Sequence, residues 1–123
     1  MTVESKVKAK KRVVVKIGTS TLAKGAAALD SLVSDICAER RKGVEFLLVT
    51  SGAIGAGMKR LHWDKRPEDI RKKQAAAAVG QVALMETYQN LFKKHGAVVA
   101  QVLLTRGDFE QRQQYLKIGR AHV

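Results

Sequence analysis

The chain has few cysteines, prolines and aromatic residues, and it is short of acidic ones. Its single cysteine, Cys37, excludes an internal disulfide framework and a cysteine-based metal site. Cys37 falls on an apolar helical stripe, so we interpret it as a buried, inert thiol in a reducing compartment. No apolar run reaches the roughly 18 residues of a membrane helix, and no apolar signal core follows the charged N-terminus. We therefore expect a cytoplasmic protein with no membrane partner.

Acidic residues are outnumbered, because 11 Asp and Glu against 23 Lys and Arg give a net charge of +12. Such a balance suits an anionic partner, namely nucleic acid, an acidic membrane surface or a phosphorylated ligand. Only 5% of the residues are aromatic, so the basic runs lack the repeated aromatic residues of a base-stacking platform. We expect no nucleic-acid partner and interpret the charge as a solvated basic surface, with attraction of a phosphate group as the main alternative.

What the sequence does contain is an alternation of apolar strands with amphipathic helices. Short β-branched or apolar runs predict strands buried on both faces at residues 12–18, 44–50 and 97–105. Helical spacing of apolar residues predicts helices at 29–43, from Pro67 to about Lys94, and from Arg106 onward. A strand, helix, strand order favours parallel pairing through a right-handed crossover. The expected fold is α/β, a three-layer αβα sandwich with a mainly parallel sheet.

Two turns that follow predicted strands could bind an anion. Ligands of an open parallel sheet bind outside the carboxyl ends of its strands, where turns present free backbone N–H groups. The first turn, VVVKIGTST, has Lys16 near the strand end, then Gly18 and three hydroxyl residues. The second, VTSGAIGAGMKRL, has glycines at 52, 55 and 57, although a glycine inside a helix costs about 1 kcal/mol against alanine. Neither turn matches a named nucleotide fingerprint and each could be a plain turn, but together they indicate an anion site.

Four motifs in this order resemble the N-terminal part of the bacterial glutamate 5-kinases, in the amino-acid kinase superfamily. They are KIGTSTL, VTSGAIGAGMKRL, KQAAAAVGQVALMETYQNLF and AQVLLTRGDFEQRQQYL. The resemblance runs from about Arg12 to Leu116 and implies an amino-acid kinase fold. It also implies that ATP, with Mg²⁺, phosphorylates the side-chain carboxylate of L-glutamate to glutamyl 5-phosphate, the first step of proline biosynthesis.

The resemblance, carried over by position, implies roles for the residues of both turns. Those that would bind ATP are Lys16, Gly18, Thr19 and Ser20. Those that would bind glutamate are Ser51, Gly52 and Ala53, with the neighbouring glycines removing side chains that would block the ligand. Lys16 would also be catalytic, by stabilising the transferred phosphoryl group. No metal ligand is expected among these residues. The helix that begins at Lys73 and Gln74 is interpreted as mainly structural, with Gly80 allowing tight packing and a direct substrate role as the alternative.

The resemblance stops where the chain reads KIGRAHV instead of the asparagine-bearing segment of the family. We expect a flexible lead-in at 1–11, an N-terminal portion of the kinase domain at 12–116, and a non-family tail at 117–123. We interpret the tail as an artefact of an incomplete gene fragment rather than as a natural terminus. A sheet cut after three strands leaves an open edge and a bare apolar face. The fold should therefore be incomplete, and the chain alone should be inactive.

Several alternatives stay open. One is another amino-acid kinase relative, such as an acetylglutamate, aspartate or uridylate kinase. A second is a fragment that binds ATP or glutamate without turnover. A third is a basic RNA-binding module, whose affinity would fall steeply with salt. For the whole protein, the resemblance also implies a homo-oligomer and a functional partnership with glutamate-5-semialdehyde dehydrogenase.

Overall fold

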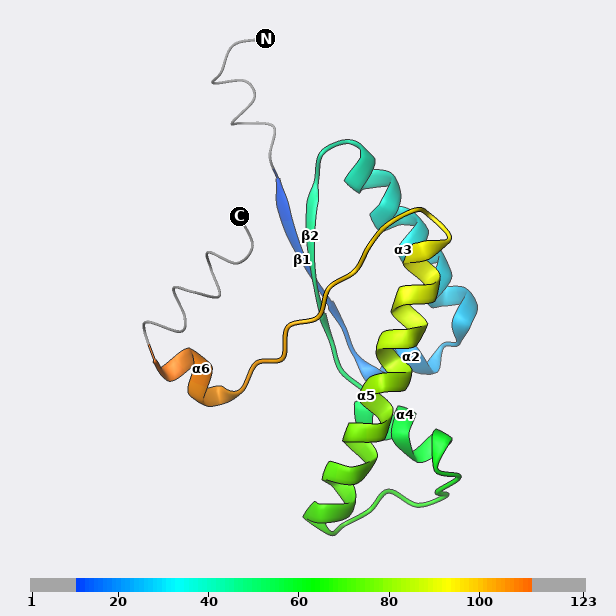
Figure 1. The fold of residues 1–123 in the computed structure, drawn as a ribbon. Helices are drawn as coiled ribbons and strands as arrows, with labels where there is room; N and C mark the ends of the chain where they lie inside the picture. Colours follow the sequence, from blue (N-terminus) through cyan, green and yellow to red (C-terminus); the bar gives the residue numbers. More distant parts are fainter. Residues whose placement is uncertain (1–10, 112–123) are drawn as a thin grey trace.

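The computed structural model describes residues 11–111, which form helices around a two-stranded parallel sheet (Figure 1). The strands are β1 (Arg12–Ile17) and β2 (Glu45–Thr50). The helices are α2 (Thr19–Ala23), α3 (Ala26–Arg41), α4 (Ala53–Arg60), α5 (Ile70–Lys93) and α6 (Arg106–Glu110). The predicted tail at 117–123, and all but the last residue of the predicted lead-in, lie outside the described residues.

The first half of the described chain is the predicted strand, helix, strand unit. Strands β1 and β2 pair in parallel, with Val13 opposite Phe46 and Ile17 opposite Thr50. Helix α3 makes the crossover between them and begins three residues before the predicted start. It is followed by Gly43, whose φ of +93° is the left-handed conformation that commonly ends a helix. Both strands and this helix are therefore confirmed.

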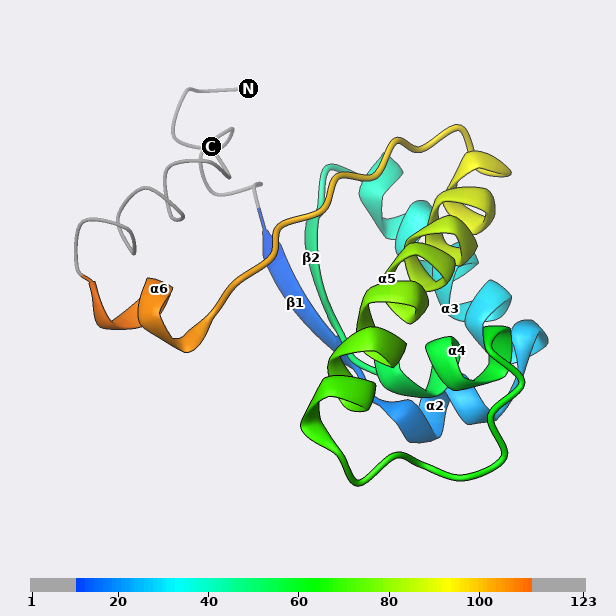
Figure 2. The ribbon, with the colours of Figure 1, turned by 60° about the horizontal axis from the view of Figure 1, so that its bottom comes forward.

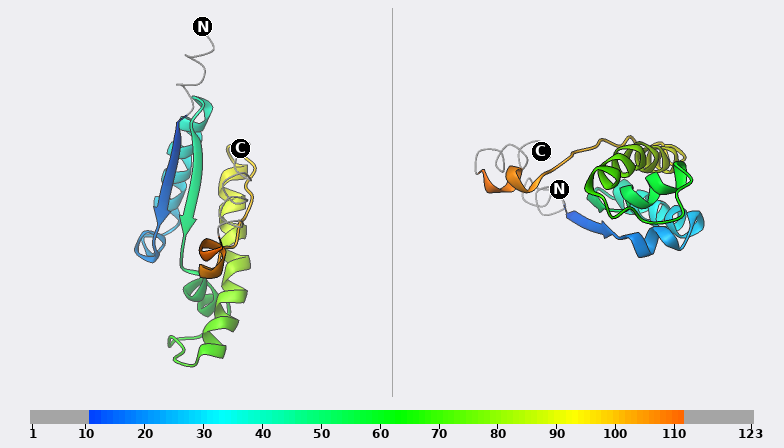
Figure 3. Two further views of the ribbon diagram at one scale, coloured as in Figure 1. Left: turned by 90° about the vertical axis from the view of Figure 1, so that its left-hand side faces the viewer. Right: turned by 90° about the horizontal axis from the view of Figure 1, so that it is seen from below.

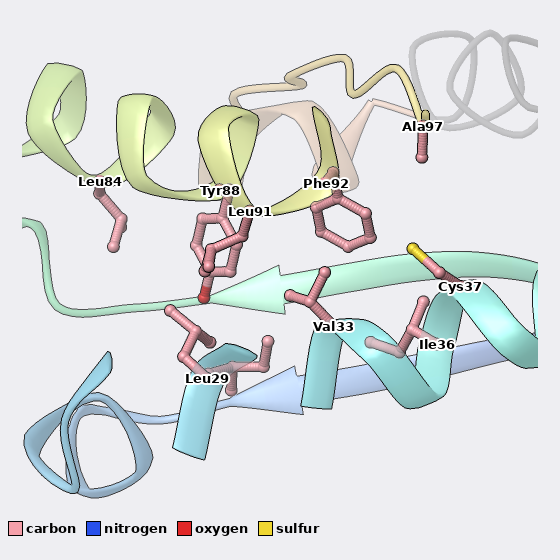
Figure 4. Close-up of a cluster of buried hydrophobic side chains, with 10 residues drawn as sticks. Leu29, Val33, Ile36, Cys37, Leu84, Tyr88, Leu91, Phe92 and Ala97 are labelled. Atoms are coloured by element: carbon pink, nitrogen blue, oxygen red, sulfur yellow. The ribbon is translucent and has the colours of Figure 1, made fainter. Parts of the chain in front are cut away.

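Helices α3 and α5 pack together over one face of the sheet, and the core lies between them (Figures 3 and 4). Side chains of the two helices point toward one another there, and alternate residues of the strands complete the cluster (Figure 4). Cys37 belongs to it and is 3% exposed, which confirms its predicted burial. The cluster consists of Ile17, Leu29, Val33, Ile36, Cys37, Leu84, Tyr88, Leu91, Phe92 and Ala97.

The other face of the sheet is open in residues 11–111. Val14 is 61% exposed there, Val49 48% and Leu47 37%. The strands were predicted to be buried on both faces, and only one face is covered, because the described helices α3 and α5 lie on the same side. The mixed α/β architecture with a parallel sheet is confirmed, with one helical layer in the described part.

The prediction of a third strand at 97–105 is wrong for this structure. The segment leaves α5 as an extended chain that does not pair with β1 or β2 and leads to α6 (Figure 2). Val98 is 92% exposed and Leu103 is 72% exposed. Apolar, β-branched residues favour a strand only where neighbouring strands and a covering layer receive them. The helix predicted from Arg106 onward is present as α6, and Asp108 accepts a 2.6 Å hydrogen bond from the Thr105 N–H at its start.

Helix α5 begins later than Pro67, which was predicted to open it. Its N-cap is Asp69, whose carboxylate accepts a hydrogen bond from the Arg71 N–H at 3.4 Å. Asp satisfies an otherwise unpaired N–H at this position, whereas Pro67 lies in the preceding link. The helix ends at Lys93, one residue before the predicted end. Gly96, with a φ of +69°, follows it.

Two glycines bring α4 and α5 into backbone contact. A Cβ atom at Gly80 would overlap the carbonyl of Ala53, and one at Gly57 would overlap the backbone of Ala76. The predicted role of Gly80 in tight packing is therefore confirmed. The interpretation that the glycines of the second turn keep a ligand path clear is wrong for Gly57, because this residue is buried against α5.

We expect Gly57→Ala to destabilise the chain by about 1–3 kcal/mol, because backbone atoms of Ala76 cannot rotate out of the way as a side chain can. The matched control is Gly55→Ala in the same helix, where a Cβ meets nothing within 4 Å. That change should stabilise by up to about 1 kcal/mol, since it removes a helical glycine. Urea unfolding followed by circular dichroism measures both. Equal midpoints for the two variants would contradict the packing role of Gly57.

Candidate functional site

The two predicted binding turns lie side by side at the carboxyl ends of β1 and β2. Ile17 and Thr50, the last residues of the two strands, are opposite each other in the ladder. Ser51, which follows Thr50, donates its backbone N–H to the Ile17 carbonyl at 3.1 Å. The Ser51 hydroxyl lies 3.5 Å from the same carbonyl. Parallel pairing thus delivers both turns to one edge of the sheet, which is where open α/β sheets bind ligands.

The first turn is shorter than predicted, because Thr19 and Ser20 already belong to helix α2. Gly18 is extended, with φ −86° and ψ 170°, and caps this helix without a side-chain hydrogen bond. Its carbonyl accepts from the N–H groups of Thr21 and Leu22, at 3.1 and 3.2 Å. The earlier N–H groups of a helix have no intrahelical acceptor, so those of Thr19 and Ser20 are donors for a ligand.

Lys16 lies one residue before the end of β1, on the open face of the sheet. The strand alternates, so Val15 and Ile17 face the helices while Lys16 lies on the opposite side, next to Val49 in the ladder. Its side chain is exposed. The structure therefore places Lys16 beside the two turns, on the face of the sheet that the described residues leave uncovered.

The second turn depends on the conformation of Gly52. Its φ of +101° lies in the left-handed region, where L-residues with a side chain are strained. A Cβ at this position would also lie 2.8 Å from Leu22 Cδ1 and 3.5 Å from Thr19 Cγ2. The two turns therefore touch each other through Gly52 and α2. A side chain at Gly52 would therefore strain the backbone and displace the end of the Leu22 side chain.

Helix α4 points its N-terminus at this turn. Ala53 is its first residue, Gly52 is its N-cap, and no side chain fills the cap. The backbone N–H groups of the first turn of a helix are unpaired, and the helix dipole adds positive potential there. Ser51 is exposed beside them. A hydroxyl, free N–H groups and the positive end of a helix can together bind a carboxylate or a phosphate.

A residue of α5 that the sequence did not single out supports the second turn. The hydroxyl of Tyr88 lies 2.7 Å from Oγ1 of Thr50, the last residue of β2. Figure 4 shows this hydroxyl directed at the end of β2. Burial raises the pKa of Tyr88, more than the bond to Thr50 lowers it. The hydroxyl is therefore neutral at ordinary pH. The only sequence signals were the position of Tyr88 on the apolar stripe of α5 and the inward position of Thr50 in an alternating strand.

The two turns carry no carboxylate. No acidic residue occurs in the first turn of α2 or of α4. Within residues 11–111, no group of three His, Cys, Asp or Glu side chains is arranged to hold a metal ion. The donors of the two turns suit anions. Two shallow hollows of the described surface lie elsewhere, at the amino end of β2 and beside Val79 and Val82 of α5.

Comparison with known proteins agrees with this arrangement. The profile of the Amino acid kinase family matches residues 11–121, which is most of the chain. The chain belongs to the amino acid kinase family. The resemblance inferred from the four motifs is thereby confirmed. Among the helices of residues 11–111, none is long and apolar enough to cross a membrane.

Curated relatives carry a more specific name. The chain is 46% identical over 116 residues to the glutamate 5-kinase of Azoarcus sp. (strain BH72), and the match covers 90% of this chain and 31% of that protein. It is 44% identical over 111 residues to the glutamate 5-kinase of Methylococcus capsulatus, covering 86% and 30%. The glutamate 5-kinase of Caldanaerobacter subterraneus is 46% identical, covering 87% and 30%. The chain thus spans about 30% of the length of the curated relatives it matches.

We expect Gly52→Ala to disturb α2 as well as its own turn, because the new Cβ meets Leu22 and Thr19. Gly43→Ala is the matched control, since Gly43 has a similar φ of +93° but nothing within 4 Å of a Cβ. Both variants should lose about 1–2 kcal/mol of stability from the left-handed backbone. Only Gly52→Ala should shift the backbone amide resonances of α2 in a two-dimensional NMR spectrum. Unchanged α2 resonances in that variant would show that the turns are not in contact.

Proposed function

We propose that the whole protein transfers the γ-phosphoryl group of ATP to the side-chain carboxylate of L-glutamate, giving glutamyl 5-phosphate. Residues 11–111 would supply one side of both binding surfaces. The observation that carries the proposal is the contact between two donor-rich turns at the carboxyl ends of β1 and β2, through Gly52 and Leu22. The names of the relatives, at 44–46% identity, favour glutamate as the acceptor.

The β2–α4 turn would hold glutamate. The Ser51 hydroxyl and the unpaired N–H groups of Gly52 and Ala53 offer donors for a carboxylate at the positive end of α4. The open second turn is formed by small residues, so a ligand can approach its backbone closely. Glutamate would bind with its side-chain carboxylate directed toward the first turn.

The β1–α2 turn would hold the phosphates. Gly18, Thr19 and Ser20 would line their path with backbone N–H and hydroxyl donors. Lys16 would bring positive charge to the transferring phosphoryl group, where charge on the equatorial oxygens must be balanced. A carboxylate oxygen of glutamate attacks the γ-phosphorus, the bond from that phosphorus to the bridging oxygen breaks, and ADP leaves with the electron pair.

No general base is required for this transfer. The acceptor carboxylate has an ordinary pKa of about 4.3 and is already ionised at neutral pH. The transfer can therefore take place although no acidic residue occurs at the start of α2 or of α4. Catalysis by this part of the chain would then consist of positioning and charge balance.

Mg²⁺ is predicted as the ion that accompanies ATP. The starts of α2 and α4 offer a magnesium ion no carboxylate, so these two turns by themselves do not fit it.

The 123-residue chain itself would bind ligands without turnover. Thr19, Ser20 and Ser51 are exposed and one face of the sheet is bare in the described part, so these residues alone would enclose neither substrate. The remaining expectations for the whole protein are a cytoplasmic location, a role in proline biosynthesis, a homo-oligomer and partnership with glutamate-5-semialdehyde dehydrogenase. The location was inferred from the composition and N-terminus of the sequence, the other three come from the resemblance, and all stay predictions.

A chimera that joins residues 1–116 to the remainder of the Azoarcus relative tests the proposal. We expect ATP-dependent formation of glutamyl hydroxamate when hydroxylamine traps the acyl phosphate. Lys16→Ala should lower the rate about 100-fold or more, the scale seen when a charge-stabilising donor is removed. Lys24→Ala, at the exposed C-cap of α2, is the control and should change the rate little.

The outcomes separate the parts of the proposal. A folded chimera that makes no hydroxamate from glutamate would overturn the substrate, and acetylglutamate, aspartate and uridylate would then be tried as acceptors. Hydroxamate formation that is equally fast in Lys16→Ala would overturn the catalytic role of Lys16 and leave the substrate in place.

A further inference from the structure

The hydroxyl pair between Thr50 and Tyr88 lies at the edge of an otherwise apolar cluster. Tyr88 is 4% exposed and packs with Leu84, Leu91 and Phe92. Phenylalanine would fill nearly the same volume there without a polar atom to satisfy. Removing such a hydroxyl together with its partner is often nearly neutral for stability. Packing of the core therefore explains the ring of Tyr88 but not its hydroxyl.

The partner of this hydroxyl stands directly before the second turn. Thr50 is the last residue of β2, and Ser51 and Gly52 follow it. On the β1 side, the Ser51 N–H is held by the Ile17 carbonyl at 3.1 Å. On the α5 side, Thr50 Oγ1 is held by the Tyr88 hydroxyl at 2.7 Å. The turn thus has one hydrogen-bonded anchor on each side.

Helix α5 touches the turn at a second place. Gly80 packs against the Ala53 carbonyl, just after the turn, while Tyr88 bonds to Thr50, just before it. Residues 80 and 88 are separated by roughly 12 Å along a helix, at 1.5 Å per residue. One rigid helix therefore contacts both ends of the segment from Thr50 to Ala53. The segment cannot shift along the sheet edge without breaking one of these contacts.

The χ1 angle of Thr50 links this bond to the backbone. Threonine is branched at Cβ, so its side-chain rotamer is closely coupled to the local backbone conformation. Without Tyr88, the remaining contact of Oγ1 is the Ser51 carbonyl at 3.4 Å, which belongs to the turn itself. Oγ1 would then move together with the turn and would no longer hold it in place.

We propose that Tyr88 is a positioning residue for the glutamate-binding turn, acting through Thr50. The inference rests on the proposed function for the identity of the ligand, but not for the mechanical link itself. Tyr88 touches no substrate in this account. Its hydroxyl holds Thr50, and Thr50 holds Ser51 and Gly52 at the level of the Ile17 carbonyl.

The test of the mechanical link needs no ligand. Hydrogen exchange of the Ser51 amide is measured in the 123-residue chain relative to the Leu47 amide, which lies in the middle of the same strand and on the same edge, facing β1. Tyr88→Phe and Thr50→Val should each raise this ratio about three- to tenfold, the scale expected from the loss of one hydrogen bond. Thr50→Ser keeps the hydroxyl and should restore the wild-type ratio. The double variant Tyr88→Phe/Thr50→Val should show no further rise, because both changes remove the same bond.

A structural control separates positioning from general loss of stability. Phe92→Leu shortens a buried side chain of the same cluster and has no bond to Thr50. It should speed exchange at Ser51 and Leu47 together and leave their ratio unchanged. An unchanged ratio in Tyr88→Phe, or an equal rise in Phe92→Leu, would overturn the proposal.

Calorimetric titration with L-glutamate and with ATP then connects the link to binding. Tyr88→Phe should weaken glutamate binding about three- to tenfold and leave ATP binding unchanged. Equal glutamate affinity in wild type and Tyr88→Phe would overturn the positioning role and leave the proposed function intact. A wild-type chain that binds ATP but not glutamate would instead count against the ligand of the second turn, with the exchange ratio still deciding the link.

Discussion

The parallel register of β1 and β2 determines where every residue of the candidate site lies. Ile17 stands opposite Thr50, so both turns leave the sheet at the same level and at the same edge. An antiparallel pair would put the two turns at opposite ends of the strands. A slip of one residue would turn Thr50 and Leu48 outward and send Val49 toward the helices. The crossover helix α3, buried through Val33 and Ile36, makes the parallel arrangement possible.

Helix α5 packs against the elements that carry the two turns. Gly80 of α5 packs against Ala53 of α4, and Gly57 of α4 packs against Ala76 of α5. The two helices are therefore closer together than larger side chains would allow. The aromatic residues of α5 fill the space above the sheet, and Tyr88 reaches the end of β2. The donor-rich turns are therefore mounted on packed elements, although the turns themselves are open. A surface of this kind binds by prearranged donors and positive potential, with little enclosure.

Local patterns predicted the elements well. Apolar runs located β1 and β2, helical spacing located α3 and α5, and the rule for parallel sheets put the two turns at one edge. Features that depend on distant parts of the chain were beyond the sequence. The run at 97–105 has strand-like residues but no ladder partner among the described residues. A glycine needed for helix contact, as at Gly57, looks the same in sequence as one that clears a ligand path. The bond from Thr50 to Tyr88 joins residues 38 apart.

The most direct test of the account is to map ligand-induced changes in the backbone amide resonances of the 123-residue chain. L-glutamate should shift the resonances of Ser51 to Gly55, and ATP should shift those of Gly18 to Thr21, with smaller changes elsewhere. Shifts of that kind would establish that the two strand ends form adjoining binding surfaces. Shifts confined to the basic link and helix start at 65–73, or the same set of shifts for both ligands, would contradict the account and indicate attraction by charge alone.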